Sequence, residues 1–258
     1  MDWIVTLTPE VSDDPFAALA SPPAGAAVVE LRLDLFPNLD IRSAISACPL
    51  PVLVTLRSCA EGGRGPDDPA TRAEILGAAR DAGAILIDLE HARDGRLINA
   101  LGLGPEQVVL SWHDPSGTPD DLEHVAAQLL ESPARMVKLI PTTHSLADLE
   151  QVLALHRRFN RSRPHNRRLL TFAMGTVGIA SRYLAPLLGP PLSYASWRDG
   201  AAAAPGQLTV AQLEAVIGHL AGPPRRLFGV VGRDVSRSLS PALHCAGYRA
   251  LDLPDILI

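Results

Sequence analysis

Eight short apolar segments rich in β-branched residues, separated by segments of helical periodicity, restrict the fold of this sequence more than any other feature. The predicted strands are residues 3–8, 27–35, 52–57, 84–90, 107–113, 135–140, 169–174 and, more weakly, 192–197. The predicted helices include residues 40–48, 70–82, 120–131, 146–159, 178–188 and 210–220. This alternation predicts an α/β protein with a (β/α)8 (TIM) barrel. A doubly wound sheet is the alternative, but the count of eight and the lack of a glycine-rich turn after an early strand favour the barrel.

Composition excludes several classes of protein. The 258 residues are 47% hydrophobic, which is enough for a sizeable core. The net charge of −5 argues against a nucleic-acid partner. The acidic N-terminus lacks the apolar run of a signal peptide, and no stretch of about 18 apolar residues predicts a membrane span. Three widely spaced cysteines, Cys48, Cys59 and Cys245, are typical of a reducing compartment, so we expect a cytoplasmic protein with no membrane partner.

One lysine stands apart from all other cations. Of the 23 lysine and arginine residues, only Lys138 is a lysine, and it lies in the sixth predicted strand between Val137 and Leu139. If these two neighbours face the helices, Lys138 points into the barrel. Arginine keeps its proton, whereas a desolvated lysine amine can act as a nucleophile. We therefore predict a catalytic Lys138, with a structural ion pair to a carboxylate as the alternative.

Further polar residues lie at the predicted strand ends, where barrels carry their active sites. His113 ends the strand next to that of Lys138 and is a candidate acid or base. Arg57 ends the third strand, and Glu61 follows four residues later, in a loop whose glycines permit close approach to a ligand. A structural histidine and a solvated surface ion pair are the alternatives. Together with Lys138, these side chains suit proton abstraction beside a ketone held as an imine.

Other charged residues are candidates for ligand binding. Glu30, Arg32 and Asp34 alternate along the second strand and therefore share one face, as ligand-binding groups or as a structural ionic layer. Arg182, after the seventh strand, is a candidate for a substrate carboxylate, and Gln207 is a candidate donor after the eighth. The histidines and carboxylates lack the close spacing of metal ligands, so we expect no metal.

A series of motifs follows these strand ends in order. They are Glu-Leu-Arg-Leu-Asp (30–34), Arg-Ser-Cys-Ala-Glu-Gly-Gly (57–63), Asp-Leu-Glu (88–90), Ser-Trp-His-Asp (111–114), Val-Lys (137–138), Met-Gly to Ser-Arg (174–182) and Ala-Pro-Gly-Gln (204–207). Over about residues 3–221 the sequence resembles type I 3-dehydroquinate dehydratase of the shikimate pathway. The resemblance implies a lyase that converts 3-dehydroquinate to 3-dehydroshikimate, needs no metal or dissociable cofactor, and forms a homodimer.

The resemblance also implies roles for individual residues. Lys138 would form a Schiff base with the C3 ketone of 3-dehydroquinate. His113 would remove the C2 proton and then act as acid for the departing C1 hydroxyl, and Glu61 would orient it. Arg182 and Gln207 would hold the carboxylate end. The remaining substrate-binding residues implied are Thr6, Glu30, Arg32 and Arg57.

The composition changes after residue 222. Residues 223–226 form a predicted linker, followed by a strand at 227–231 and a helix from 241 to about 251. About 30 residues cannot form an independent core. The segments Phe-Gly-Val-Val-Gly (228–232) and Ser238-Leu239-Ser240-Pro241 resemble the start of shikimate dehydrogenase, which implies that Ser238 and Ser240 are a remnant of its shikimate site. We expect a barrel at 1–222 and the first part of a second domain at 227–258, without NADP-dependent activity.

Two other functions compete with the dehydratase. A class I aldolase-type Schiff-base barrel would carry a phosphate site after strands seven and eight, where Arg182 and Gln207 suit a carboxylate better. A catalytically silent ligand-sensing domain would be free to lose Lys138 or His113, and both are present.

Overall fold

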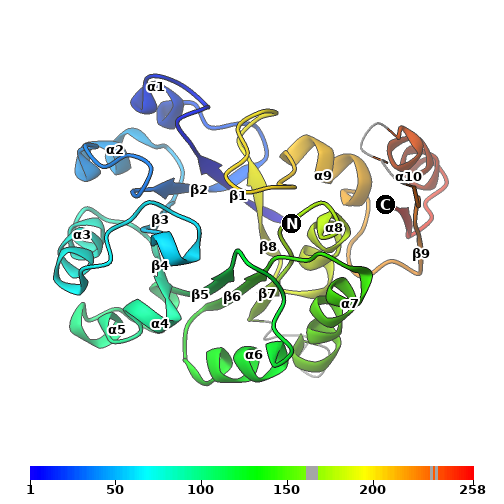
Figure 1. Cartoon of the computed structure of the whole chain (residues 1–258). Helices are drawn as coiled ribbons and strands as arrows, with labels where there is room; N and C mark the ends of the chain where they lie inside the picture. Colours follow the sequence, from blue (N-terminus) through cyan, green and yellow to red (C-terminus); the bar gives the residue numbers. More distant parts are fainter. Residues whose placement is uncertain (161–167, 233–234, 236–237) are drawn as a thin grey trace.

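The computed structural model describes residues 1–160, 168–232, 235 and 238–258. Eight parallel strands form one sheet in the order β7-β6-β5-β4-β3-β2-β1-β8, so that β1 pairs with both β2 and β8 and the sheet curls into a nearly closed barrel (Figure 1). The (β/α)8 prediction is confirmed. The strands are β1 Asp2–Leu7, β2 Ala26–Arg32, β3 Val52–Thr55, β4 Leu86–Glu90, β5 Val108–Asp114, β6 Met136–Pro141, β7 Leu169–Thr171 and β8 Leu192–Ser196.

Helices cover the outside of the barrel (Figure 1). Their starts follow local sequence signals: Ser145 and Asp148 form a reciprocal capping box before α7, and Thr209 and Gln212 form another before α9. The α-helices of the barrel are α1 Pro15–Ala20, α2 Ile41–Ala47, α3 Pro69–Asp81, α4 His91–Asp94, α5 Leu97–Ala100, α6 Leu122–Glu131, α7 Leu146–Leu155, α8 Ile179–Leu188 and α9 Val210–Ile217. No helix in the described part of the chain is long and apolar enough to cross a membrane.

Sequence periodicity missed the shortest elements and one irregularity. Helices α1, α4 and α5 contain six residues or fewer, too few for a helical period to show. The helix predicted at 146–159 is an α-helix only to Leu155 and continues as a π-helical turn, His156–Asn160. In that turn His156 Nε2 lies 2.8 Å from the Thr171 carbonyl oxygen, and Asn160 donates to the Leu169 carbonyl, so the turn is tied to β7.

Successive side chains along each strand point alternately toward the helices and toward the inside of the barrel, so the apolar residues form two separate cores. Val137 and Leu139 of β6 belong to the large core between strands and helices, whereas Met136 lies in the smaller core inside the barrel. Lys138 therefore points inward, on the same side as Met136. Pairing in register sets Ser111 of β5 beside Lys138, and Thr55 of β3 beside Asp88 of β4. The inner wall is thus apolar near one end and polar toward the carboxyl ends.

The C-terminal residues form a small unit against the barrel. Strand β9 Arg226–Phe228 pairs in parallel with β10 Asp255–Leu257, and α10 Ser240–Ala250 connects them and contacts α9 (Figure 1). The strand predicted at 227–231 starts one residue earlier, at Arg226, and ends at Phe228, although the Val230 backbone N–H still donates to the Ile258 carbonyl at 2.8 Å. Strand β10 was not predicted, since three residues give no usable alternation.

Candidate active site

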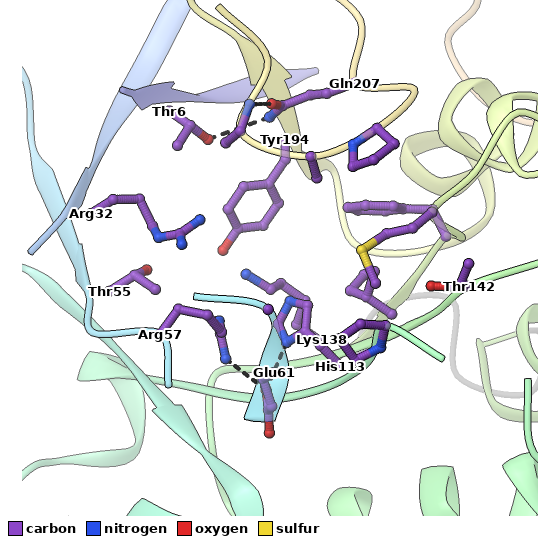
Figure 2. A pocket seen from close by; sticks show the side chains of 18 of the residues that line it. Thr6, Arg32, Thr55, Arg57, Glu61, His113, Lys138, Thr142, Tyr194 and Gln207 are labelled. Carbon is purple, nitrogen blue, oxygen red and sulfur yellow. Dashed lines mark hydrogen bonds and ion pairs between the residues drawn. The ribbon is translucent and has the colours of Figure 1, made fainter. Parts of the chain in front are cut away.

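A cavity of about 310 Å³ opens at the carboxyl ends of the barrel strands. Figure 2 shows its side chains converging from different strands and loops. Of the barrel residues predicted to touch a ligand, Asp34 does not line it; those that do are Thr6, Glu30, Arg32, Arg57, Glu61, His113, Lys138, Arg182 and Gln207. The fold therefore brings together residues that are up to 201 positions apart in the sequence.

Lys138 lies at the bottom of this cavity and is 5% exposed. Its Nζ donates to Asp88 Oδ2 at 2.9 Å, lies 4.0 Å from a carboxylate oxygen of Glu30, and sits 4.2 Å from the centre of the Tyr194 ring. Burial opposes ionisation of Asp88, but the positive charges of Arg57 and Lys138 prevail and lower its pKa to about 2. Asp88 is therefore a permanent anion that fixes the amine, while the open side of the amine faces the cavity.

His113 and Glu61 form a pair beside Lys138. His113 Nδ1 lies 2.9 Å from Glu61 Oε2, and Arg57 Nη1 donates to the same oxygen at 2.8 Å (Figure 2). Burial and the nearby charges of Arg57 and Lys138 lower the pKa of His113 well below its usual value, so the imidazole is neutral. Burial raises the pKa of Glu61 to about 8, with Arg57 opposing this and the Glu90 and Asp88 charges adding to it. With Nδ1 engaged, Nε2 is the nitrogen free to exchange a proton with a ligand.

Arg57 is the centre of a buried network rather than half of a solvated ion pair, because only 3% of it is exposed. Its guanidinium contacts Asp88 at 2.9 Å, Glu61 at 2.8 Å, Glu90 at 3.3 Å and the Ser111 hydroxyl at 2.9 Å. Burial alone would lower the pKa of Arg57, but these carboxylates raise it. The arginine therefore holds three carboxylates, one from the loop after β3 and two from β4, in fixed positions.

The residues of β2 face the cavity from the other side. Glu30 accepts hydrogen bonds from the hydroxyls of Thr6 and Thr55, both at 2.7 Å. Arg32 forms two parallel hydrogen bonds with Asp34, each 2.7 Å long. The ionic layer is therefore present, and two of its members, Glu30 and Arg32, also line the cavity. Ligand binding by these residues stays a prediction.

Arg182 is a buried cation without a carboxylate partner among the described residues. Its guanidinium lies 4.6 Å from the centre of the Phe172 ring and donates to the Pro205 carbonyl at 3.1 Å, while its Nε has no partner in the described part of the chain. Burial lowers the pKa of Arg182 to about 10. Gln207 donates toward the Thr6 hydroxyl at 3.4 Å. This end of the cavity is a site for an anion that the protein does not supply.

Comparison with known proteins agrees with this arrangement. The sequence pattern described as "Type I 3-dehydroquinase" matches residues 5–222. The chain belongs to this family. It is 35% identical over 193 residues to a 3-dehydroquinate dehydratase of Dehalococcoides mccartyi, covering 73% of the chain and 84% of the relative. It is also 29% identical to the chloroplastic bifunctional 3-dehydroquinate dehydratase/shikimate dehydrogenase of Arabidopsis thaliana, covering 91% of this chain and 40% of that one.

Solved structures of the family have the same fold. The dehydroquinate dehydratase and shikimate dehydrogenase part of S. pombe AroM matches with a TM-score of 0.69 and 26% identity, over 99% of this chain and 51% of that one. The type I 3-dehydroquinate dehydratase of Clostridium difficile matches with a TM-score of 0.69 and 21% identity, over 83% and 91% of the two chains. This chain thus spans most of the single-function relatives but only 40% and 51% of these two larger ones.

Two residues that contact Lys138 were given no role from the sequence. Asp88 was considered at the end of the fourth strand only as part of a motif and of a disfavoured metal site, although its place in β4 on the same side as the inward-facing polar residues is a usable signal. Tyr194 lies in the apolar run of β8, where nothing in the sequence distinguishes a cavity-lining phenol from a core aromatic.

The tail residues Ser238 and Ser240 lie apart from this cavity. Neither lines it, and the Ser240 backbone N–H donates to the Ser238 hydroxyl at 3.3 Å at the start of α10. Within the described residues no group of three histidine, cysteine or acidic side chains is arranged to hold a metal ion.

Proposed function

We propose that this dehydroquinase converts 3-dehydroquinate to 3-dehydroshikimate through an imine on Lys138, with His113 as acid and base. The observation that carries the proposal is the convergence, in one cavity, of the lone lysine, a neutral histidine and a buried arginine that no carboxylate of the described residues pairs with. In the shikimate pathway this reaction serves aromatic amino acid biosynthesis.

The reaction begins at the Lys138 amine. In its neutral form the amine adds to the C3 carbonyl of 3-dehydroquinate, and loss of water leaves a protonated imine. The imine withdraws electrons from the C2–H bond, and His113 Nε2 takes the C2 proton, so that the electron pair of that bond forms an enamine. The enamine electrons expel the C1 hydroxyl, which receives a proton from His113 and leaves as water. Hydrolysis of the imine releases 3-dehydroshikimate and restores the amine.

The electrostatics of the pair suit this proton transfer. The lowered pKa of His113 keeps it neutral and able to accept the C2 proton. Glu61 holds Nδ1 at 2.9 Å, which orients the ring. The same histidine then has a proton to give to the leaving hydroxyl. We propose that no metal or dissociable cofactor takes part, because the imine itself serves as the electron sink.

Substrate binding follows from the unpaired groups. Arg182 and Gln207 would hold the C1 carboxylate, since no anionic side chain in the described part of the chain pairs with the buried guanidinium. Glu30, Arg32, Arg57 and Thr6 would surround the ring hydroxyls. An aldolase-type reaction is less well supported, because the cavity offers one cation at this end rather than a loop of backbone amides for a phosphate.

Borohydride trapping tests the proposal. The protein is incubated with 3-dehydroquinate and borohydride, and the intact mass and the modified peptide are determined. We expect one reduced adduct on Lys138, because the other reactive amine is the chain's own N-terminus, and we expect turnover to 3-dehydroshikimate in the absence of borohydride. A folded protein that gives neither adduct nor turnover would support the silent, ligand-sensing alternative, and an adduct without dehydration would support the aldolase-type one.

We propose that the chain consists of a barrel at 1–222, a linker at 223–226 and, at 227–258, the beginning of a shikimate dehydrogenase-like domain. The bifunctional relatives, of which this chain spans 40–51%, support this division. Shikimate-dependent reduction of NADP by the 258-residue chain would contradict it. We further propose a location in the cytosol, which the three free thiols of the described residues support. The resemblance to the family also implies a homodimer, which size-exclusion chromatography with light scattering tests.

A further inference from the structure

The hydroxyl of Tyr194 is a buried hydrogen-bond donor without an acceptor in the described part of the chain. Tyr194 lies in β8, lines the cavity and is 6% exposed, and its hydroxyl has no hydrogen-bond partner among the described residues. Within that part of the chain, Arg182 Nε is the other unpartnered buried atom of a cavity-lining side chain. An unpaired buried polar group costs free energy, so two such groups at one cavity indicate partners that arrive with the ligand.

The direction of this hydroxyl is fixed by the packing of its ring. Lys138 Nζ lies 4.2 Å from the ring centre, and the Phe172 ring packs against it with a centroid distance of 6.4 Å. Figure 2 shows the phenol oxygen directed into the space between Arg32 and Lys138. Burial, together with the charges of Glu30 and Asp88, raises the pKa of Tyr194 well above its usual value. The group is therefore a hydrogen-bond donor throughout the neutral range.

Other polar groups on this side of the cavity already have protein partners. The two Glu30 oxygens accept from Thr6 and Thr55, and Arg32 is held by Asp34 through two hydrogen bonds. A substrate hydroxyl that enters here must compete with these bonds. At Tyr194 the substrate hydroxyl meets a donor that makes no hydrogen bond with the described residues, so no existing hydrogen bond has to break.

The shape of the substrate determines which hydroxyl this is. Under the proposed function, Lys138 holds C3 and Arg182 holds the carboxylate on C1. In a six-membered ring the atom opposite C1 is C4, which is also bonded to C3. We propose that the Tyr194 hydroxyl donates a hydrogen bond to the C4 hydroxyl of 3-dehydroquinate and so selects substrates that carry a hydroxyl next to the reacting ketone. This inference rests on the proposed function and adds a specificity-determining residue to it.

The test removes the proposed hydrogen bond first by replacing the tyrosine and then by removing the C4 hydroxyl of the substrate. Wild type, Tyr194→Phe and, as a matched control, Tyr183→Phe are assayed with 3-dehydroquinate and with its 4-deoxy analogue. Tyr183 lies in α8 and does not line the cavity. We expect Tyr194→Phe to raise KM for 3-dehydroquinate about five- to tenfold, the usual effect of one lost hydrogen bond, with kcat changed less than about twofold. With the 4-deoxy analogue, wild type and Tyr194→Phe should have the same KM, and Tyr183→Phe should match wild type throughout.

Stability supplies an independent readout. Because the phenol hydroxyl has no hydrogen-bond partner within the residues that the structure describes, Tyr194→Phe should unfold at the same urea concentration as wild type or at a higher one. A lower midpoint would mean that the hydroxyl serves the fold and would overturn the inference, as would an unchanged KM or an equal loss with the 4-deoxy analogue. A wild-type protein that does not turn over 3-dehydroquinate would overturn the proposed function as well.

Discussion

Replacement of Arg182 by methionine should make the free protein more stable and the substrate complex much weaker. Burial lowers the pKa of Arg182 from 12.5 to about 10, and the folded state therefore binds this proton less tightly than the unfolded state does. At pH 7 that difference corresponds to a cost of about 3 kcal/mol, which would be relieved only as the pH rises above about 10. Methionine keeps much of the apolar stem and removes the charge.

Two interactions reduce this gain. The contact with the Phe172 ring, 4.6 Å away, contributes about 1 kcal/mol, and the hydrogen bond to Pro205 contributes a similar amount, although that carbonyl lies on an exposed residue and can regain water. We therefore expect Arg182→Met to increase the free energy of unfolding by about 1–2 kcal/mol. Without the Arg182 guanidinium, the substrate carboxylate loses its buried positive partner. The free energy of substrate binding should become weaker by about 3 kcal/mol, which corresponds to a rise in KM of about 100-fold.

Urea denaturation at pH 7 and a steady-state assay that follows the absorbance of the conjugated enone product measure the two effects. Arg42→Met, on the exposed face of α2, is the matched control and should change the free energy of unfolding by less than about 0.5 kcal/mol. A variant of Arg182 that is destabilised by more than about 1 kcal/mol, or whose KM stays within about threefold of wild type, would refute the reasoning.

Three further predictions concern the centre of the cavity. Lys138→Ala should abolish the reduced adduct, whereas His113→Ala should still form it with 3-dehydroquinate and lose turnover; equal loss of adduct in both would contradict their separate roles. Asp88→Asn should lower the free energy of unfolding at pH 7 by about 3 kcal/mol, because Arg57 and Lys138 then lose an anionic partner. In wild type the stabilisation by the ionised Asp88 is present above about pH 4 and is lost as the pH falls through about 2. Urea denaturation of both proteins at pH 7 and pH 3 measures these effects. Glu61, with its pKa raised to about 8, should make wild type less stable as the pH rises from 5 to 8, by at most about 4 kcal/mol, and Glu61→Gln should flatten this slope in the same measurement.

The barrel could be predicted because its strands are buried on both faces and read as continuous apolar runs. The strand ends were then enough to collect the cavity residues, since parallel strands in a barrel bring their carboxyl ends to one rim. His113 and Lys138 illustrate this: they lie in adjacent strands, and the sequence alone places them at the same end. The motif resemblance added the reaction, which no periodicity contains.

The contacts between side chains of different strands could not be predicted from the sequence. The contact between Lys138 and Asp88 skips one strand and depends on the register of β4, β5 and β6. The direction of the Tyr194 hydroxyl depends on how its ring packs, which a pattern of apolar residues does not encode. The three-residue β10 and the π-helical turn after α7 are too short and too irregular to leave a period in the sequence.

The buried charges around Arg57 also bear on how the chain reaches its native state. Arg57 is joined to Asp88, 31 residues later, and to Ser111, 54 residues later, and Lys138 closes back onto Asp88 across 50 residues. An intermediate that had assembled β3 and β4 without β6 would hold Asp88 and its neighbours in a half-dry environment with charges unmatched. Such partly folded barrels are therefore unstable. The strands from β3 to β6 should fold together in one slow, late step, because their contacts close long loops of the chain. The same ion pairs that equip the cavity for chemistry would make folding of this half of the barrel nearly all-or-none.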